Sequence, residues 1–188
     1  MGKLYLKLFL LVVLTTLYSC KTTKNLEISA PFSEKKYKSN KNFFRVTSSG
    51  SSKDLETAKK KAIMNAKSEL SGNIRSTVKA VTDQYTNSTT VEDNEQFENK
   101  FEELARTVVK EILSDLDVKE EKLFRETDKK TGKDNYLVWV VIEMSRQSVF
   151  DDMNNKISKD QKLQLDYDKM KYEKIFNSEM EKLAEENN

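Results

Sequence analysis

A β-strand is predicted over Tyr136-Leu137-Val138-Trp139-Val140-Val141-Ile142-Glu143-Met144. Successive side chains of a strand point to opposite faces of a sheet, and both alternating sets of this stretch are apolar. Such a pattern is typical of a strand at the centre of a sheet, or of one covered on both faces. Residues 118–127 favour a second strand. The charged connection 128–134 between the two contains Gly132, so the pair predicts a β-hairpin.

A strand followed by a helix is predicted upstream of this hairpin. Residues 42–48 favour a strand because they include aromatic and β-branched side chains. Ser49-Gly50-Ser51-Ser52 then has the composition of a turn. Asp54 is suited to cap a helix that begins at Leu55, because its carboxylate can accept a hydrogen bond from a free backbone N–H of the first turn.

The helix that begins at Leu55 has one apolar face. The residues of this face recur at every fourth position: Ala58, Ala62, Ala66, Leu70, Ile74 and Val78. Residues four apart lie on the same side of a helix. Because alanine side chains are small, this face predicts a helix that approaches the sheet closely.

Two further helices are predicted around the hairpin. Residues 83–95 are polar and lack a regular apolar face, which favours a loop. The next amphipathic helix is marked by apolar residues at three- and four-residue spacing: Phe97, Phe101, Leu104, Ala105, Val108, Ile112 and Leu116. After Ser145 the helical spacing returns with Val149, Phe150, Met153 and Ile157.

These elements together predict an α+β fold. The expected architecture is a small antiparallel sheet in the order β-α-α-β-β-α, with helices packed mainly on one face and an additional C-terminal helix. The folded domain is expected to cover residues 42–158, and a charged helix residues 159–188.

The N-terminal residues predict an export signal. An apolar run begins at Leu8 behind a short basic region, and it is too short to span a bilayer core of roughly 30 Å. The run ends at Leu17-Tyr18-Ser19-Cys20, which resembles the lipobox of bacterial lipoproteins, although Tyr18 departs from the small residue usual there. Residues 1–19 are therefore expected to be a signal peptide, Cys20 the lipidation site and residues 20–41 a flexible tether. The alternative is a secreted protein with Cys20 as a spare thiol.

A family resemblance extends this expectation. Four features carry it: the stretch Phe43-Phe44-Arg45-Val46, the Ser-Gly-Ser segment, the alanine face of the first helix and the strand at 136–144. Together they resemble the Lpp-twenty-type family of small bacterial outer-membrane lipoproteins, over roughly residues 42–153. The resemblance implies a β-α-α-β-β-type domain at the outer membrane without an established enzymatic activity, and it supplies no site residues.

The residues after Cys20 bear on location within the envelope. Position 21 is Lys, whereas aspartate directly after the acylated cysteine is the familiar inner-membrane retention signal. The stretch Lys21-Thr22-Thr23-Lys24 lacks an acidic cluster resembling a surface-export signal. The expected location is the outer membrane, lipid-anchored and facing the periplasm.

Composition restricts the chemistry that this chain can perform. Two of its 33 basic residues lie within residues 1–19, so the remaining chain has 31 basic and 31 acidic residues, interspersed along the sequence. Nucleic-acid binding normally needs clustered Lys and Arg, so no nucleic-acid partner is expected. The chain has no histidine, and its one cysteine is the expected lipidation site. No cofactor, metal or catalytic residue is predicted, and the protein is not expected to be an enzyme.

Three weaker alternatives concern binding and catalysis. An acidic group at Asp115, Asp117, Glu120 and Glu121 could bind a divalent cation or act as a glycosidase-like pair, but it lacks the spacing of a calcium loop and is also typical of a solvated helix end. Trp139 could line a pocket for a small apolar ligand or lipid, or belong to the core. A hydrolase that works without histidine is a third hypothesis.

The C-terminal helix supplies the candidate interaction residues. Its apolar side chains are Tyr172, Ile175, Phe176 and Leu183. They could cover the domain, contact a membrane interface or bind a partner. The leading hypothesis is a lipid-anchored envelope protein with a structural or protein-interaction role. Its expected partners are the membrane, through acyl chains on Cys20, and another envelope protein, through this helix.

Overall fold

A computed structural model of the chain describes residues 30–89, 94–114 and 116–186. The predicted lipidation site Cys20 lies outside these residues. The elements, in chain order, are η2 (Lys35–Tyr37), β1 (Phe43–Ser52), α2 (Leu55–Ser88), α3 (Asn94–Ser114), β2 (Val118–Thr127), β3 (Asp134–Ser145), α4 (Arg146–Ile157), α5 (Gln161–Asp166) and α6 (Lys169–Glu186). The predicted α+β fold class is confirmed, with the expected order β-α-α-β-β-α.

The hairpin strand at 136–144 is the centre of the sheet, as predicted. The sheet is antiparallel with the order β1-β3-β2, so β3 pairs with a neighbour on both sides. Its two apolar faces enter different clusters. Val138, Val140 and Ile142 belong to the main core beneath the helices, whereas Val141 belongs to a smaller cluster on the opposite face.

The first strand is longer than predicted. Ser49–Ser52 were expected to form a turn, but they pair with Trp139–Tyr136 of β3 and are the last part of β1. Their polar composition is compatible with a strand because β1 lies at the edge of the sheet. The chain turns after Ser52 instead, and the Asp54 carboxylate accepts a hydrogen bond from the backbone N–H of Thr57 at 2.8 Å. The predicted helix cap is therefore confirmed.

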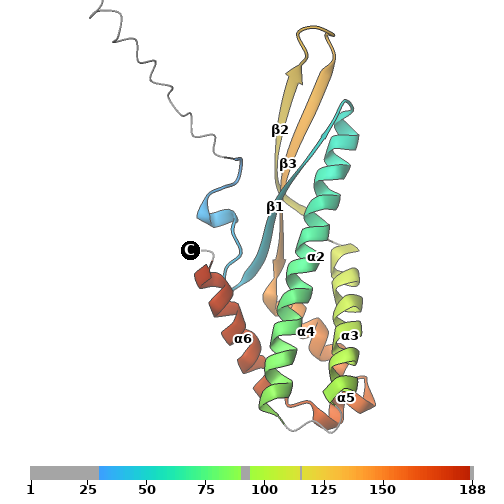
Figure 1. The fold of residues 1–188 in the computed structure, drawn as a ribbon, viewed down its shortest axis with the longest axis vertical. Coiled ribbons are helices and arrows are strands. Elements are labelled where there is room, and N and C mark those ends of the chain that lie inside the picture. Colours follow the sequence, from blue (N-terminus) through green and yellow to red (C-terminus); the bar gives the residue numbers. More distant parts are fainter. Residues whose placement is uncertain (1–29, 90–93, 115, 187–188) are drawn as a thin grey trace, which may run out of the picture. The chain divides into compact units, whose positions relative to one another are not determined.

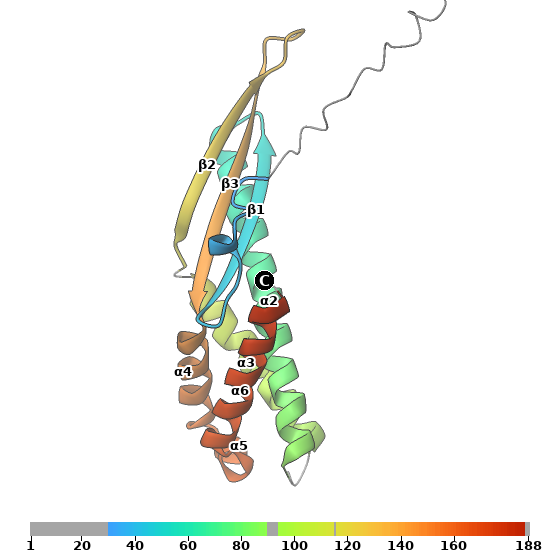
Figure 2. The same cartoon turned by 90° about the vertical axis from the view of Figure 1, so that its left-hand side faces the viewer.

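Helix α2 covers one face of the sheet, as Figures 1 and 2 show. The predicted face of α2 is buried along its whole length, from Ala58 to Val78. The helix then continues to Ser88, so the loop predicted at 83–95 is wrong in its first part. Tyr85 and Thr86 are buried because the end of α2 packs against α3 and α6. No helix in the described part of the chain is both long and apolar enough to cross a membrane.

Below the sheet, α2 packs against α3 and α6, and α3 packs against α4, in a helical bundle (Figure 1). Aromatic side chains from these helices and from the α5–α6 connection, which contains Tyr167, contact one another in its centre: Tyr85, Phe97, Phe101, Phe150, Tyr167, Tyr172 and Phe176. Large aromatic side chains contribute much of the apolar area buried in a small core. The bundle is thus built from all the predicted helices, the C-terminal one included.

The other face of the sheet is partly covered by residues 31–41. Phe32 and Tyr37 are buried there against Val141 and Trp139, and their rings meet edge to face with centroids 4.8 Å apart. The Tyr37 hydroxyl donates a hydrogen bond to Glu120 at 2.7 Å. The tether predicted for residues 20–41 differs from the structure here, because the folded part begins at Pro31 and not at residue 42.

Candidate functional site

The C-terminal helix does not present the surface that the sequence suggested. Tyr172 and Phe176 of α6 are only 1% and 3% exposed, and Ile175 is partly buried against the same core. The side chain of Leu183 lies outside the described part of the structure. The expectation that Tyr172 and Phe176 face a partner is therefore wrong: these side chains complete the bundle, and the helix packs on the domain.

The acidic group at the start of β2 does not converge on one point. Asp115 lies outside the described residues, and Asp117 is exposed. Glu120 and Glu121 are neighbours in a strand and point to opposite faces. Glu120 accepts the hydrogen bond of Tyr37, and Glu121 forms an ion pair with Lys59 of α2 at 2.9 Å. Within the described residues, no group of acidic side chains is arranged to hold a metal ion.

Trp139 lies on the face of the sheet that carries Val141. It is partly buried against the cluster formed by Phe32, Tyr37 and Val141. The side chain therefore takes part in packing, as the core interpretation expected. Trp139 does not line the groove that lies between residues 32–39, β1 and the middle of α2.

A projecting hairpin is the first candidate site. β2 and β3 extend beyond the N-terminal end of α2 in Figures 1 and 2. The tip is well fixed: the Asp128 carboxylate accepts backbone hydrogen bonds from Lys130 and Thr131, both at 2.8 Å, and Gly132 adopts the left-handed conformation that the turn requires. Arg125 on β2 pairs with Asp134 on β3 at 2.7 Å. The hairpin is an ordered element, although every residue of β2 after Val118 is exposed.

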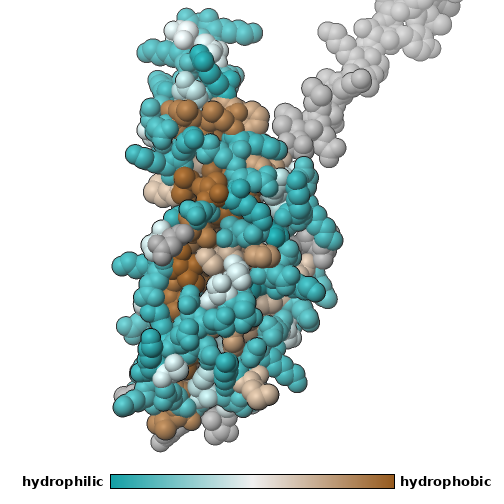
Figure 3. All heavy atoms as spheres, turned by 180° about the vertical axis from the view of Figure 1, so that it is seen from behind, coloured by the Kyte–Doolittle hydropathy of each residue, from teal (hydrophilic) through white to brown (hydrophobic). Residues whose placement is uncertain are grey.

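Two apolar side chains lie on the exposed strand of this hairpin. Leu123 and Phe124 are 47% and 46% exposed. Leu123 lies opposite Val138 and Phe124 opposite Leu137, so the two point to opposite faces. Figure 3 shows apolar side chains at the level of the hairpin and in a band below it. β2 is an edge strand, and no backbone hydrogen bond joins its outer edge to another part of the described chain, so these groups can pair with another chain.

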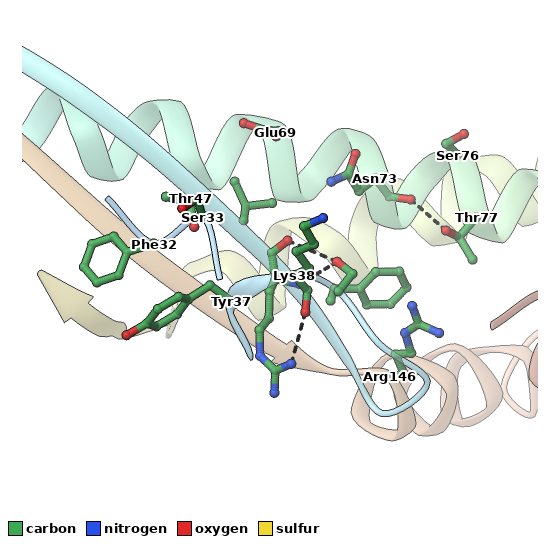
Figure 4. A pocket seen from close by; sticks show the side chains of 14 residues that line it. Phe32, Ser33, Tyr37, Lys38, Thr47, Glu69, Asn73, Ser76, Thr77 and Arg146 are labelled. Atoms are coloured by element: carbon green, nitrogen blue, oxygen red, sulfur yellow. Dashed lines mark hydrogen bonds between the residues drawn. The ribbon is translucent and has the colours of Figure 1, made fainter. Parts of the chain in front are cut away.

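A groove along the outer edge of β1 is the second candidate site. Its volume is about 440 Å³, and it lies between residues 32–39, β1 and the middle of α2 (Figure 4). Aromatic and aliphatic side chains form part of its wall: Phe32, Tyr37, Phe44 and Val46. The polar part comes mainly from hydroxyl, amide and basic side chains: Ser33, Lys38, Ser39, Arg45, Thr47, Asn73, Ser76, Thr77 and Arg146, together with Glu69.

One lining residue of the groove is a buried cation. Arg146, at the start of α4, is 2% exposed and donates a hydrogen bond from Nη1 to the carbonyl oxygen of Met180 at 2.8 Å. Its guanidinium stacks on the ring of Phe44, with Cζ 4.9 Å from the ring centroid. Burial lowers the pKa of Arg146 to about 10, so the side chain remains charged at neutral pH.

Comparisons with known proteins add no family. A scan against protein-family models finds no match, and searches of the curated proteins and of the solved structures find none either. The resemblance to the Lpp-twenty-type lipoproteins therefore stays a prediction.

Sequence reasoning missed the residues that define both sites. Leu123 and Phe124 are consecutive apolar residues within a strongly charged strand. This contrast in polarity is the sequence feature that could have indicated a binding surface. Arg146 directly follows the central strand, where the chain leaves the sheet. Nothing in the local sequence indicates that its side chain is buried, because α6 covers it from the far end of the chain.

Proposed function

We propose that this protein is a non-enzymatic interaction module of the bacterial envelope, which binds another envelope protein through the β2–β3 hairpin. The observation that carries the proposal is the pair Leu123 and Phe124, each nearly half exposed on an ordered hairpin that projects beyond the helices. Interface residues that contribute most to affinity are commonly large apolar or aromatic side chains surrounded by polar ones. Lys122 and Arg125 flank this pair and supply such a polar rim.

The geometry of β2 supports binding by strand addition. A free edge strand offers a row of backbone donors and acceptors, and a partner strand gains specificity from side chains on both faces. Leu123 and Phe124 would contact the two faces of such a partner strand. The charged residues around them, among them Glu121 and Lys122, discourage indiscriminate pairing between copies of an exposed edge.

Anchoring at the membrane is a separate part of the proposal. The segment Leu17-Tyr18-Ser19-Cys20 supports acylation of Cys20, and the residues after it, Lys21-Thr22-Thr23-Lys24, support an outer-membrane location and a periplasmic orientation. Two or more acyl chains hold a protein stably at a bilayer. The anchor and the hairpin would then lie in different parts of the chain, so that loss of one need not affect the other.

Affinity purification after crosslinking in intact cells tests the hairpin. The double variant Leu123→Thr/Phe124→Thr retains β-favouring residues and removes the apolar surface. The matched control is Leu165→Thr/Met170→Thr, which changes two residues that are each 82% exposed at the α5–α6 end of the bundle. We expect the same envelope protein to be recovered with the unmodified chain and the control, and to be lost with the hairpin variant. Equal recovery with all three proteins would reject the hairpin as the binding surface.

Ligand binding is a second candidate function, favoured by the groove at Arg146. The hydrolase hypothesis has no comparable support: within the described residues, the strongly raised pKa values of Tyr167 and Tyr172 result from burial in the bundle and not from placement in a cleft.

A further inference from the structure

The groove along β1 contains a positive charge that no acidic side chain among the described residues neutralises. Arg146 forms no ion pair with any acidic residue in the described part of the chain, and burial is the only cause of its lowered pKa. A buried charge without a counterion is strongly unfavourable. Arginine cannot avoid that cost by losing its proton at neutral pH. A positively charged guanidinium in this position is well suited to an anion.

The unpaired atoms of Arg146 have the arrangement that binds oxyanions. Nη1 donates to the Met180 carbonyl, whereas Nε and Nη2 are buried and have no hydrogen-bond partner among the described residues. These two nitrogens are bonded to the same carbon, so that an N–H bond of each points in the same direction. Carboxylate and phosphate groups accept such a parallel pair of hydrogen bonds through two oxygens.

A second unpaired donor lies in the same groove. The Thr47 hydroxyl is buried and has no hydrogen-bond partner in the part of the chain that the structure describes. On either side of Thr47, outer backbone groups of β1 form hydrogen bonds with side chains. The Arg45 N–H and carbonyl both bond to the Ser39 hydroxyl, and the Ser49 carbonyl accepts a hydrogen bond from the Asn65 side chain. Thr47 lies between these two positions, so the edge of β1 has polar groups available at the groove.

The walls of the groove define the rest of the ligand. Phe32, Tyr37, Phe44 and Val46 offer apolar surface, and the volume of about 440 Å³ lies within the range of small-molecule sites. Lys38 lines the groove beside α2 and adds positive charge (Figure 4). We propose that this groove binds a small organic anion whose carboxylate or phosphate group pairs with Arg146 and whose apolar part lies against these side chains. The hairpin takes no part in this site.

Calorimetric titration of the full chain carrying Cys20→Ser tests the proposal. Octanoate, octyl phosphate and inorganic phosphate are the anionic probes, and 1-octanol is the neutral one. We expect saturable binding of octanoate or octyl phosphate, and at least about tenfold weaker binding of 1-octanol, because a hydrogen bond to a charged group contributes about 1.5–3 kcal/mol. Inorganic phosphate that binds as tightly as octyl phosphate would overturn the apolar part of the proposal.

Substitutions of Arg146 separate charge from geometry. Arg146→Met removes the charge and keeps an unbranched side chain, and Arg146→Lys keeps the charge but loses the paired donors. Both should weaken anion binding at least about tenfold, while Arg106→Met, at an exposed position on α3, should bind like the unmodified chain. Circular dichroism confirms folding of each variant. Undiminished anion binding by folded Arg146→Met and Arg146→Lys, or no saturable anion binding by the unmodified groove, would overturn the proposal.

Discussion

Gly50 of β1 lies directly against the backbone of Ala62 in α2. A Cβ atom on Gly50 would be 2.4 Å from the Ala62 backbone nitrogen and 2.6 Å from the Ala58 carbonyl oxygen. The alanine face of α2 and the one glycine of β1 together allow the helix to rest on the sheet at this point. The close packing of β1 and α2 therefore depends on small residues in both elements, glycine in the strand and alanine in the helix.

Substitution of Gly50 should destabilise the protein. Gly50→Ala forces the backbones of β1 and α2 apart. Overpacking of this kind typically lowers the free energy of unfolding by about 1–3 kcal/mol. The free energy of unfolding in urea measures the effect. Gly72→Ala is the matched control: no atom of the described residues lies within 4 Å of a Cβ at Gly72 in α2, so alanine should stabilise the helix by about 0.5–1 kcal/mol. Equal effects of the two substitutions would contradict this packing.

Phe176 should behave as a core residue. Phe176→Ala leaves a cavity in the bundle and should cost about 3–5 kcal/mol of unfolding free energy. Met170→Ala, at an exposed position of the same helix, should stay within about 0.5 kcal/mol of the unmodified chain. A truncation after Lys159 should lose cooperative unfolding. If Phe176→Ala unfolds at the same urea concentration as Met170→Ala, then α6 is peripheral after all.

The Tyr85 hydroxyl should hold the start of α6 in place. It donates a hydrogen bond to the Asp166 carbonyl and accepts one from the Asp168 N–H, both at 2.7 Å. Tyr85→Phe leaves the Asp168 N–H without its partner and should lower the free energy of unfolding by about 1–3 kcal/mol. Hydrogen exchange measured by NMR should become faster at the Asp168 amide by a larger factor than at Ala66 in the middle of α2. Unchanged exchange at Asp168 would show that the contact contributes little.

The ion pairs of Glu143 should make the free energy of unfolding depend on pH in the acidic range. Burial raises the pKa of Glu143, but hydrogen bonds from Lys119 and Arg45 outweigh burial and hold the pKa below its usual value of 4.5. A carboxyl with a lowered folded pKa stabilises the protein above its unfolded pKa, and this stabilisation is lost as the pH falls through the folded value. Because the three residues join β1, β3 and β2, acid should weaken the sheet.

Glu143→Gln isolates this contribution. The unmodified chain should lose more unfolding free energy between about pH 5 and pH 3 than Glu143→Gln does, since the amide does not titrate in this range. Glu126→Gln, at an exposed position of β2, should follow the unmodified chain. Parallel pH profiles for Glu143→Gln and the unmodified chain would contradict the effect.

Cys20 should determine membrane association and leave folding unchanged. Cys20→Ala removes the only thiol, so no acyl chain can be attached there. The variant should leave the membrane fraction in cell fractionation, and its circular dichroism spectrum should match that of the domain with Cys20. A membrane fraction that retains Cys20→Ala would contradict the lipoprotein part of the proposal.

The sequence predicted the elements whose patterns are local. The two apolar sets of β3, the alanine face of α2 and the cap at Asp54 depend on neighbours within a few residues, and all three are confirmed. The errors at Ser49–Ser52 and at Tyr85 have a different origin. Polar residues are strand or helix there because β3, α3 and α6 pack against them from distant parts of the chain.

The candidate sites were harder to predict from the sequence, because they too depend on contacts between distant parts of the chain. An aromatic residue on an amphipathic helix fits a core and a binding surface equally well, and Phe176 is buried only because α2 and α4 surround it. Phe124 is exposed because β2 is an edge strand, which depends on strand order. The paired free donors of Arg146 depend on where α6 places the Met180 carbonyl. None of these relationships is encoded by local spacing.

Site-specific photo-crosslinking in living cells tests the interaction proposal most directly. A photoreactive residue is placed at position 124 on the hairpin, or at position 170 on the exposed start of α6 as the control. We predict one discrete crosslinked product from position 124, an adduct with a single envelope protein, and no such product from position 170. An adduct between two copies of this chain would reassign the hairpin to self-association. No discrete product at position 124, or the same product at both positions, would contradict the hairpin as the interaction surface.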